Sequence, residues 1–202
     1  IPEGVTAIGG FTFSSCTSLG TVKLPATLTT IGGYAFYGCK QLNSADLPAA
    51  LTSIGSGAFS KCALKSVSIS DTVTSIGGSA FSGCASLASV TLGSSLTEIP
   101  AEAFYNCTAL TSITIPEGVT TIGESAFAGC TSLASVVIPD SVTSIGENAF
   151  SGCTALATVK LGGGLTSIEA GLFDGCPITD LTISEGVTTI GERAFAGGKF
   201  QK

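Results

Sequence analysis

The sequence predicts a repeat solenoid, a coil in which one short structural unit is copied about nine times and stacked on its neighbours. Three columns of residues indicate this fold, because phenylalanine, isoleucine and cysteine each recur every 22 or 23 residues along a chain of 202 residues. A constant period of this length is typical of units that bury an apolar face only against each other. The phenylalanine column consists of Phe13, Phe36, Phe59, Phe81, Phe104, Phe127, Phe150, Phe173 and Phe195.

All units share one pattern of apolar columns, so stacked copies can bury one continuous core. We therefore expect residues 1–202 to form a single solenoid domain. Its units begin at Ile1, Leu24, Leu47, Ile69, Leu92, Ile115, Ile138, Leu161 and Ile183.

Within a unit, two segments have the pattern of short strands and the rest has the composition of turns. Residues 133–138 have the spacing Leu-x-x-Val-x-Ile, and their last part alternates as a half-buried strand does. Strands from successive units are expected to lie parallel, ~4.8 Å apart. Residues 142–145 are a second extended candidate. Residues 149–153 form a short segment that includes a glycine, which predicts a single helical or 3₁₀ turn rather than a long helix.

Departures from the pattern lie in turns or at the ends of the chain. Two units lack one residue after Cys62 and after Cys176, where a turn can change length without shifting a strand. In the last unit Gly198 replaces the cysteine, and Phe200 takes the leucine position. The first unit carries an additional aromatic residue, Phe11. The terminal departures are interpreted either as caps over the ends of the stack or as sequence drift.

One unit reads Leu110-Thr111-Ser112-Ile113-Thr114-Ile115-Pro116, then Val119-Thr120-Thr121-Ile122-Gly123, then Ala126-Phe127-Ala128-Gly129-Cys130. This motif resembles the BspA-like class of leucine-rich repeats, and the match extends over essentially the whole chain. The resemblance implies a right-handed curved coil with a parallel β-sheet on its concave face. It also implies a surface or secreted protein, since several relatives are thought to act as adhesins, and it supplies no catalytic residues.

Charge argues against a nucleic-acid partner. The chain has 8 basic and 14 acidic residues, a formal net charge of −6, and nucleic acid requires clustered Lys and Arg. Between Ser66 and Val159 there is no Lys or Arg, whereas seven acidic residues lie there. This acidic middle is interpreted either as a solvated surface or as an attraction for cations or a basic partner. No stretch approaches the ~18 consecutive apolar residues of a membrane span.

The start of the chain is similar to the interior of a repeat. The first residues, Ile1-Pro2-Glu3-Gly4, match Ile115-Pro116-Glu117-Gly118, and no initiator methionine or signal peptide precedes them. We therefore expect the chain to be a piece of a longer protein.

The residue inventory predicts neither an enzyme, a metal site nor a cofactor. The chain has no His, so it has no Ser-His or Cys-His pair. The eight cysteines are at least 22 residues apart and lack the pair spacing of zinc sites. Parallel copies point their thiols in the same direction, so we favour free buried thiols over disulfides. The stacked pairs Glu117/Asp140 and Glu124/Glu147 are interpreted as solvated charge rather than a Ca²⁺ site, because no calcium-loop motif is present.

The outward columns of the strand at residues 135–138 and its copies are the predicted recognition surface. Hydroxyl-bearing residues dominate these columns, which contain no aromatic residue, so the surface is interpreted either as a weak binder or passive spacer or as a specific groove. The candidate binding residues are Lys23, Asp46, Ser68, Thr91, Thr114, Val137, Lys160, Thr182, Ser66, Ser89, Ser112 and Ser135.

Three functional hypotheses follow. The first is a non-enzymatic, extracellular or cell-surface adhesion module that binds a protein or a glycan on a host or neighbouring cell, with extracellular matrix proteins among the partners. Repeated weak sites would supply avidity. The second is a structural spacer or filament subunit that associates head to tail. The third is an engineered repeat protein.

Overall fold

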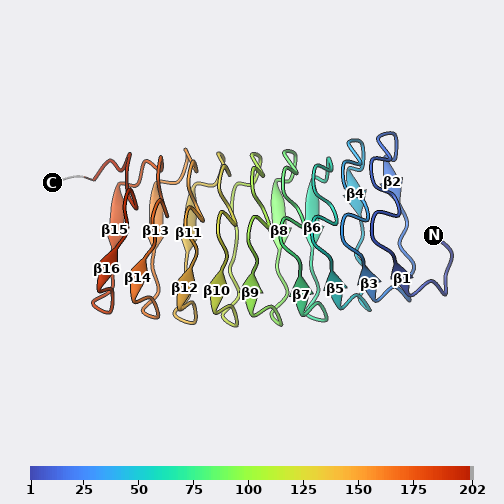
Figure 1. Cartoon of the computed structure of the whole chain (residues 1–202), viewed down its shortest axis with the longest axis horizontal. Coiled ribbons are helices and arrows are strands. Elements are labelled where there is room, and N and C mark those ends of the chain that lie inside the picture. The colour runs from blue at the N-terminus through green and yellow to red at the C-terminus, as the bar shows by residue number, and fades with distance from the viewer. Residues whose placement is uncertain (201–202) are drawn as a thin grey trace.

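The computed structural model describes residues 1–200 as a stack of coils with two short strands in most coils and no helix in that range. Figure 1 shows the coils side by side, from the N-terminal end of the stack to the C-terminal end. Sixteen strands in this range form six parallel sheets, within which the paired strands are copies from neighbouring coils. The predicted repeat solenoid is confirmed. The boundaries of the single domain stay a prediction, and residues 201–202 lie outside the described residues.

The strands of the first run, here called the isoleucine ladder, each end at an isoleucine, and this isoleucine is buried in every coil except the last. Its strands pair in register, so that Ile8 lies opposite Ile31 and Ile31 opposite Ile54. Each strand is two residues long, shorter than the extended segment that residues 142–145 predict. The ladder consists of β1 (Ala7–Ile8), β3 (Thr30–Ile31), β5 (Ser53–Ile54), β7 (Ser75–Ile76), β9 (Glu98–Ile99), β10 (Thr121–Ile122), β12 (Ser144–Ile145), β14 (Ser167–Ile168) and β16 (Thr189–Ile190).

The second run, here called the hydroxyl ladder, contains the strand predicted within residues 133–138. Its three-residue strands alternate exposed, more buried and exposed positions, which places one apolar side chain in the core between two outward ones. It consists of β2 (Thr21–Val22), β4 (Ser44–Ala45), β6 (Ser66–Ser68), β8 (Ser89–Thr91), β11 (Ser135–Val137), β13 (Thr158–Lys160) and β15 (Asp180–Thr182).

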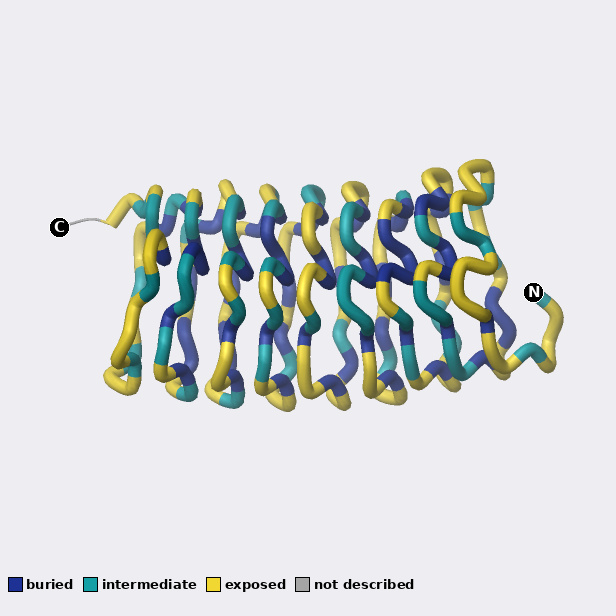
Figure 2. Tube along the Cα trace, in the orientation of Figure 1, coloured by how far each residue is buried: buried dark blue, intermediate teal, exposed yellow. Residues whose placement is uncertain are grey.

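The core is continuous inside the coils, and Figure 2 marks in dark blue the buried positions along the chain that contribute to it. Its centre is a stack of phenylalanine rings from Phe13 to Phe195, with centroids of neighbouring rings 5.2–5.7 Å apart and planes within 16° of parallel. The seven rings from Phe36 to Phe173 have no exposed surface. At the C-terminal end Phe200 packs edge-on against Phe195.

Consecutive turns replace the helical or 3₁₀ turn that we expected at residues 149–153. Asn148 and Gly152 both have positive φ, 57° and 70°, and a right-handed helical turn requires negative φ throughout. Every second N–H group in this segment therefore points toward the next coil. The Phe150 N–H donates to the Leu172 carbonyl of the next coil at 3.0 Å. These bonds join neighbouring coils at a third edge, where no strand is formed.

The cysteine column supplies hydrogen-bond donors to the core. All eight cysteines are free, as predicted, and seven are buried; Cys16 is exposed, so its predicted burial is wrong. Each buried thiol donates to the phenylalanine carbonyl of the preceding coil, with sulfur to oxygen distances of 3.1–3.3 Å. A buried carbonyl thus gains a second donor from a small, otherwise apolar side chain.

Glycine sets the separation of the coils along the isoleucine ladder. In seven coils a glycine follows the isoleucine, and in six of them its N–H donates to the isoleucine carbonyl of the preceding coil at 2.7–2.8 Å. A Cβ at any of these six glycines would collide with the backbone of the preceding coil. Pro100, which has no N–H, and Glu169 occupy this column in the two coils where the ladder is interrupted, between β7 and β9 and between β12 and β14. The glycines are Gly32, Gly55, Gly77, Gly123, Gly146 and Gly191.

We predict that Gly123→Ala lowers the free energy of unfolding by about 1–3 kcal/mol, because the new Cβ would collide with the backbone nitrogen of Ala101. The matched control is Gly163→Ala, where the nearest atom to a new Cβ is Asp140 Oδ1 at 3.7 Å. The control should gain about 0.4–1 kcal/mol from a less flexible unfolded chain. Urea titration measures both. Equal effects at the two positions would contradict the close approach of the coils.

We also predict that stability falls as pH rises above about 9. Burial raises the pKa of the Cys84 and Cys130 thiols to about 12. Unfolded thiols ionise near pH ~8.5, so above that pH the unfolded state binds fewer protons than the folded state. Each buried thiol then lowers the free energy of unfolding by about 1.4 kcal/mol per pH unit, until the pH reaches the pKa of that thiol in the folded state.

Urea unfolding under reducing conditions between pH 7 and 11 measures this slope. Cys84→Ala should make the slope shallower, whereas Cys16→Ala, at the exposed position, should leave it as in the wild type. An unchanged slope in Cys84→Ala would exclude a buried, protonated thiol at this position.

Candidate functional site

The structure places all twelve sequence-predicted binding residues on one exposed surface, the outward side of the hydroxyl ladder and of residues 112–114, here called the hydroxyl face. They are exposed because successive side chains of a strand point to opposite sides, and the intervening apolar residues fill the core. Val137 is the one apolar residue among the twelve, and 57% of its surface is exposed.

The hydroxyl ladder is interrupted at residues 112–114, where the sequence pattern predicts a strand. These residues form no strand and pair with neither β8 nor β11. Within the described range, no backbone hydrogen bond involves the N–H or C=O groups of residues 112–115. A further interruption separates β4 from β6. The interruptions leave backbone polar groups next to the hydroxyl face without protein partners.

The residue in the column after each strand varies along the hydroxyl ladder, and it does not by itself account for the break at 112–114. Gly93 and Gly162 follow the strands β8 and β13, and a Cβ at either position would collide with the backbone of the preceding coil. Both strands pair over three residues with the preceding coil. Pro116 and Pro139 occupy this column beside the break, but β2 and β4 pair although Pro25 and Pro48 follow them, so proline alone does not keep neighbouring strands apart.

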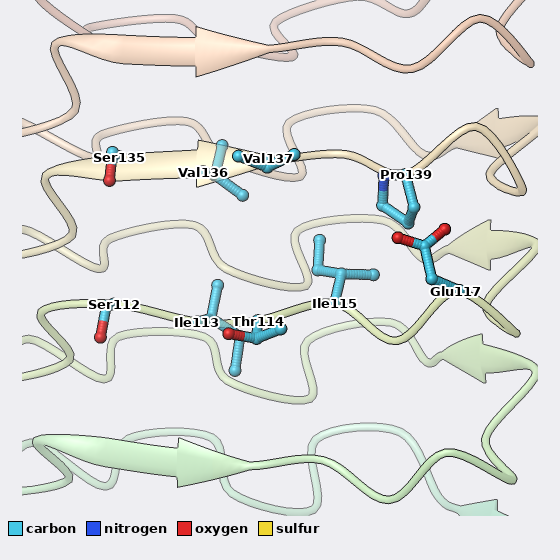
Figure 3. Close-up of a pocket in the computed structure, with 9 residues that line it drawn as sticks. All are labelled: Ser112, Ile113, Thr114, Ile115, Glu117, Ser135, Val136, Val137 and Pro139. Carbon is cyan, nitrogen blue, oxygen red and sulfur yellow. The ribbon is translucent and has the colours of Figure 1, made fainter.

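The break opens a pocket of about 260 Å³ between residues 112–117 and the start of the next coil. Figure 3 shows Ser112 and Ser135 at one end and Glu117 with Pro139 at the other. Between them the lining is largely apolar. It consists of Ile113, Thr114, Ile115, Val136 and Val137.

Three other hollows lie on the same face. One of about 300 Å³ lies at the gap between β4 and β6 and includes the predicted residues Asp46, Ser66 and Ser68. One of about 340 Å³ over β2 and β4 brings Lys23 and Asp46 together, and one of about 360 Å³ over β13 and β15 includes Lys160 and Thr182. Of the predicted residues, only Ser89 and Thr91 line none of the four hollows described here.

The acidic residues at the strand ends are partly used in joining coils. Asp140 Oδ1 accepts a hydrogen bond from the Gly163 N–H, and Asp71 Oδ1 accepts one from the Ser94 N–H, each at 2.7 Å. The bond from Ser94 lowers the pKa of Asp71. Among residues 1–200 no three His, Cys, Asp or Glu side chains lie close enough together to hold a metal ion. That part of the chain also contains no helix long and apolar enough to cross a membrane.

An aromatic cluster near the N-terminal end was not recognised as a unit in the sequence. Phe11 stacks on Tyr34 with ring centroids 5.1 Å apart, and Tyr34 meets Tyr37 edge-on at 5.8 Å. Lys61 Nζ donates to the Tyr37 hydroxyl at 2.9 Å. The signal was present, since Phe11 and Tyr34 are 23 residues apart and therefore share a column.

Comparison with known proteins agrees with this architecture. The family model described as "BspA type Leucine rich repeat region (6 copies)" matches residues 1–98, 52–139 and 74–201. Comparison with curated protein sequences gave no match.

Three solved structures are similar. A leucine-rich repeat protein from Bacteroides ovatus is 26% identical, with 98% of this chain and 75% of that chain covered and a TM-score of 0.64. The leucine-rich repeat protein of T. pallidum is 33% identical, with 88% and 76% covered and a TM-score of 0.67. A leucine-rich cell surface protein from Faecalibacterium prausnitzii is 28% identical, with 98% and 77% covered and a TM-score of 0.51.

Proposed function

Because the chain belongs to the BspA-type leucine-rich-repeat family, we propose that it is a non-enzymatic binding module of a cell-surface or secreted protein. The hydroxyl face carries this proposal. It presents exposed hydroxyl and charged side chains in parallel columns, and four hollows lie along it. Such a surface offers many similar hydrogen-bonding positions to one extended ligand, either a polypeptide or a glycan.

Repetition favours avidity over a single strong contact. A hydroxyl contributes only about 0.5–1.5 kcal/mol per hydrogen bond, but contacts along several coils to one ligand act together. A Ser-His-Asp triad cannot form because the chain has no His, and the repeat family is generally non-catalytic. An extracellular location is supported by the similar cell surface protein of F. prausnitzii.

Self-association is the alternative function. It is favoured by the apolar side chains exposed in the last coils, among them Ile190, which is 55% exposed, and Phe200, which is 48% exposed. Each interior coil buries the equivalent surface against its neighbour, so a second copy placed head to tail would continue the stack.

A pair of matched variants tests the binding role. Arginines at two exposed strand positions of the hydroxyl face, Ser89→Arg with Ser135→Arg, should weaken ligand binding at least tenfold by blocking the face. The control places arginines at equally exposed positions of the isoleucine ladder, Ser75→Arg with Ser144→Arg. Immobilised collagen, laminin and fibronectin and an oligosaccharide array are the probes, read by surface plasmon resonance and fluorescence.

Equal loss in both double variants would contradict a binding role for the hydroxyl face. Absence of binding to every probe, together with a mass in sedimentation that grows with concentration, would instead support self-association.

A further inference from the structure

We infer that the pocket between residues 112–117 and β11 receives one arginine or lysine side chain of a protein partner, an inference that rests on the binding role proposed for the hydroxyl face. A basic side chain has an apolar stem and a cationic head, and it buries the stem while the head stays hydrated. The pocket has the same division along its length. Figure 3 shows its apolar lining between Ser135 at one end and the Glu117 carboxylate beside Pro139 at the other.

The apolar part of the pocket matches the stem. Ile113, Ile115 and Val136 are 8%, 5% and 2% exposed and form its floor, whereas Val137 stands out from the surface at 57% exposed. The equivalent outward position is hydroxyl-bearing in β6 and β8 and a lysine in β13. Val137 therefore gives this coil an apolar wall that the other coils lack at that position.

The polar groups of the pocket match the head. Arginine and lysine heads carry only hydrogen-bond donors, and the Glu117 carboxylate and the unpaired carbonyls of residues 112–115 are acceptors. The unpaired N–H groups of the same segment remain available to the backbone carbonyls of an extended partner segment. The groups that the broken ladder leaves without partners are thus the groups that such a ligand requires.

Charge favours a basic side chain over an anionic one. The pocket lies in the part of the chain between Ser66 and Val159, which contains seven acidic residues and no Lys or Arg. The nearest base on the hydroxyl face is Lys160, which is in register with Val137 one coil beyond the pocket. The hollow between β4 and β6 also has a carboxylate, Asp46, but Lys23 joins Asp46 in the adjoining hollow. Glu117 has no basic residue within salt-bridge distance among the described residues.

Three labelled peptides test the inference. They share the sequence acetyl-Thr-Val-Thr-X-Thr-Val-Thr-amide, with X as arginine, norleucine or glutamate, and their binding is followed by fluorescence anisotropy at low ionic strength. Norleucine keeps the apolar stem without the charge. The arginine peptide should bind at least tenfold more tightly than the norleucine peptide, and the glutamate peptide should bind more weakly than both.

Two variants separate the head from the stem. Glu117→Gln should weaken binding of the arginine peptide at least fivefold and leave binding of the norleucine peptide unchanged. Val137→Ser should weaken binding of both peptides by a similar factor. Glu124→Gln removes an equally exposed acidic residue that lines none of the four hollows, and it should change neither peptide. Urea midpoints show whether each variant is folded.

Equal affinity for the three peptides, a preference for the glutamate peptide, or equal effects of Glu117→Gln and Glu124→Gln would each overturn the inference. Binding of the oligosaccharide array alone, with no peptide bound, would overturn it in favour of a glycan. These outcomes leave the binding role of the hydroxyl face intact as long as the Ser89→Arg and Ser135→Arg variant loses its ligand and the control keeps it.

Discussion

Register between successive coils is the constraint on which the rest of this structure depends. Each coil buries its phenylalanine, isoleucine and alanine only because the next coil places the same residue types against them, with rings 5.2–5.7 Å apart. A coil can be one residue shorter without losing this register. Ser53 pairs with Ser75 across a coil of 22 residues, whereas Thr30 pairs with Ser53 across one of 23. The missing residue is taken from the turn after Cys62, so the columns on both sides remain aligned.

Along the isoleucine ladder, the residue after each isoleucine sets how closely two coils approach. Glycine allows the backbone contact, and the ladder is interrupted where Pro100 and Glu169 replace it. Along the hydroxyl ladder, Gly93 and Gly162 accompany full pairing, but prolines follow both the paired strands β2 and β4 and the unpaired residues 112–114. The same fold thus contains closed and open stretches. Two of the four hollows on the hydroxyl face lie at open stretches, and the other two lie over paired strands.

The sequence predicted the coil, its period, the position of the hydroxyl-ladder strands and the exposure of the twelve candidate residues, because all of these follow from columns repeated in every unit. It did not predict the missing strand at residues 112–114. That break depends on how neighbouring coils approach each other, and the pattern of a single unit does not contain this information. The turns at Asn148 were also missed, since positive φ in a non-glycine residue has only a weak sequence signal. The sequence predicted that the cysteines are buried but not that their thiols donate hydrogen bonds, because these bonds to the preceding coil depend on how the coils stack.

The account predicts that coupling between core residues extends only to the neighbouring coil, as expected for a one-dimensional stack. Double-mutant cycles measure this directly. Phe104→Leu combined with Phe127→Leu, whose rings stack at 5.4 Å, should show an interaction energy of about 0.5–1.5 kcal/mol. Phe104→Leu combined with Phe36→Leu, three coils away, should be additive within about 0.5 kcal/mol. Equal coupling in the two pairs, or none in the stacked pair, would contradict a solenoid built on register between neighbours.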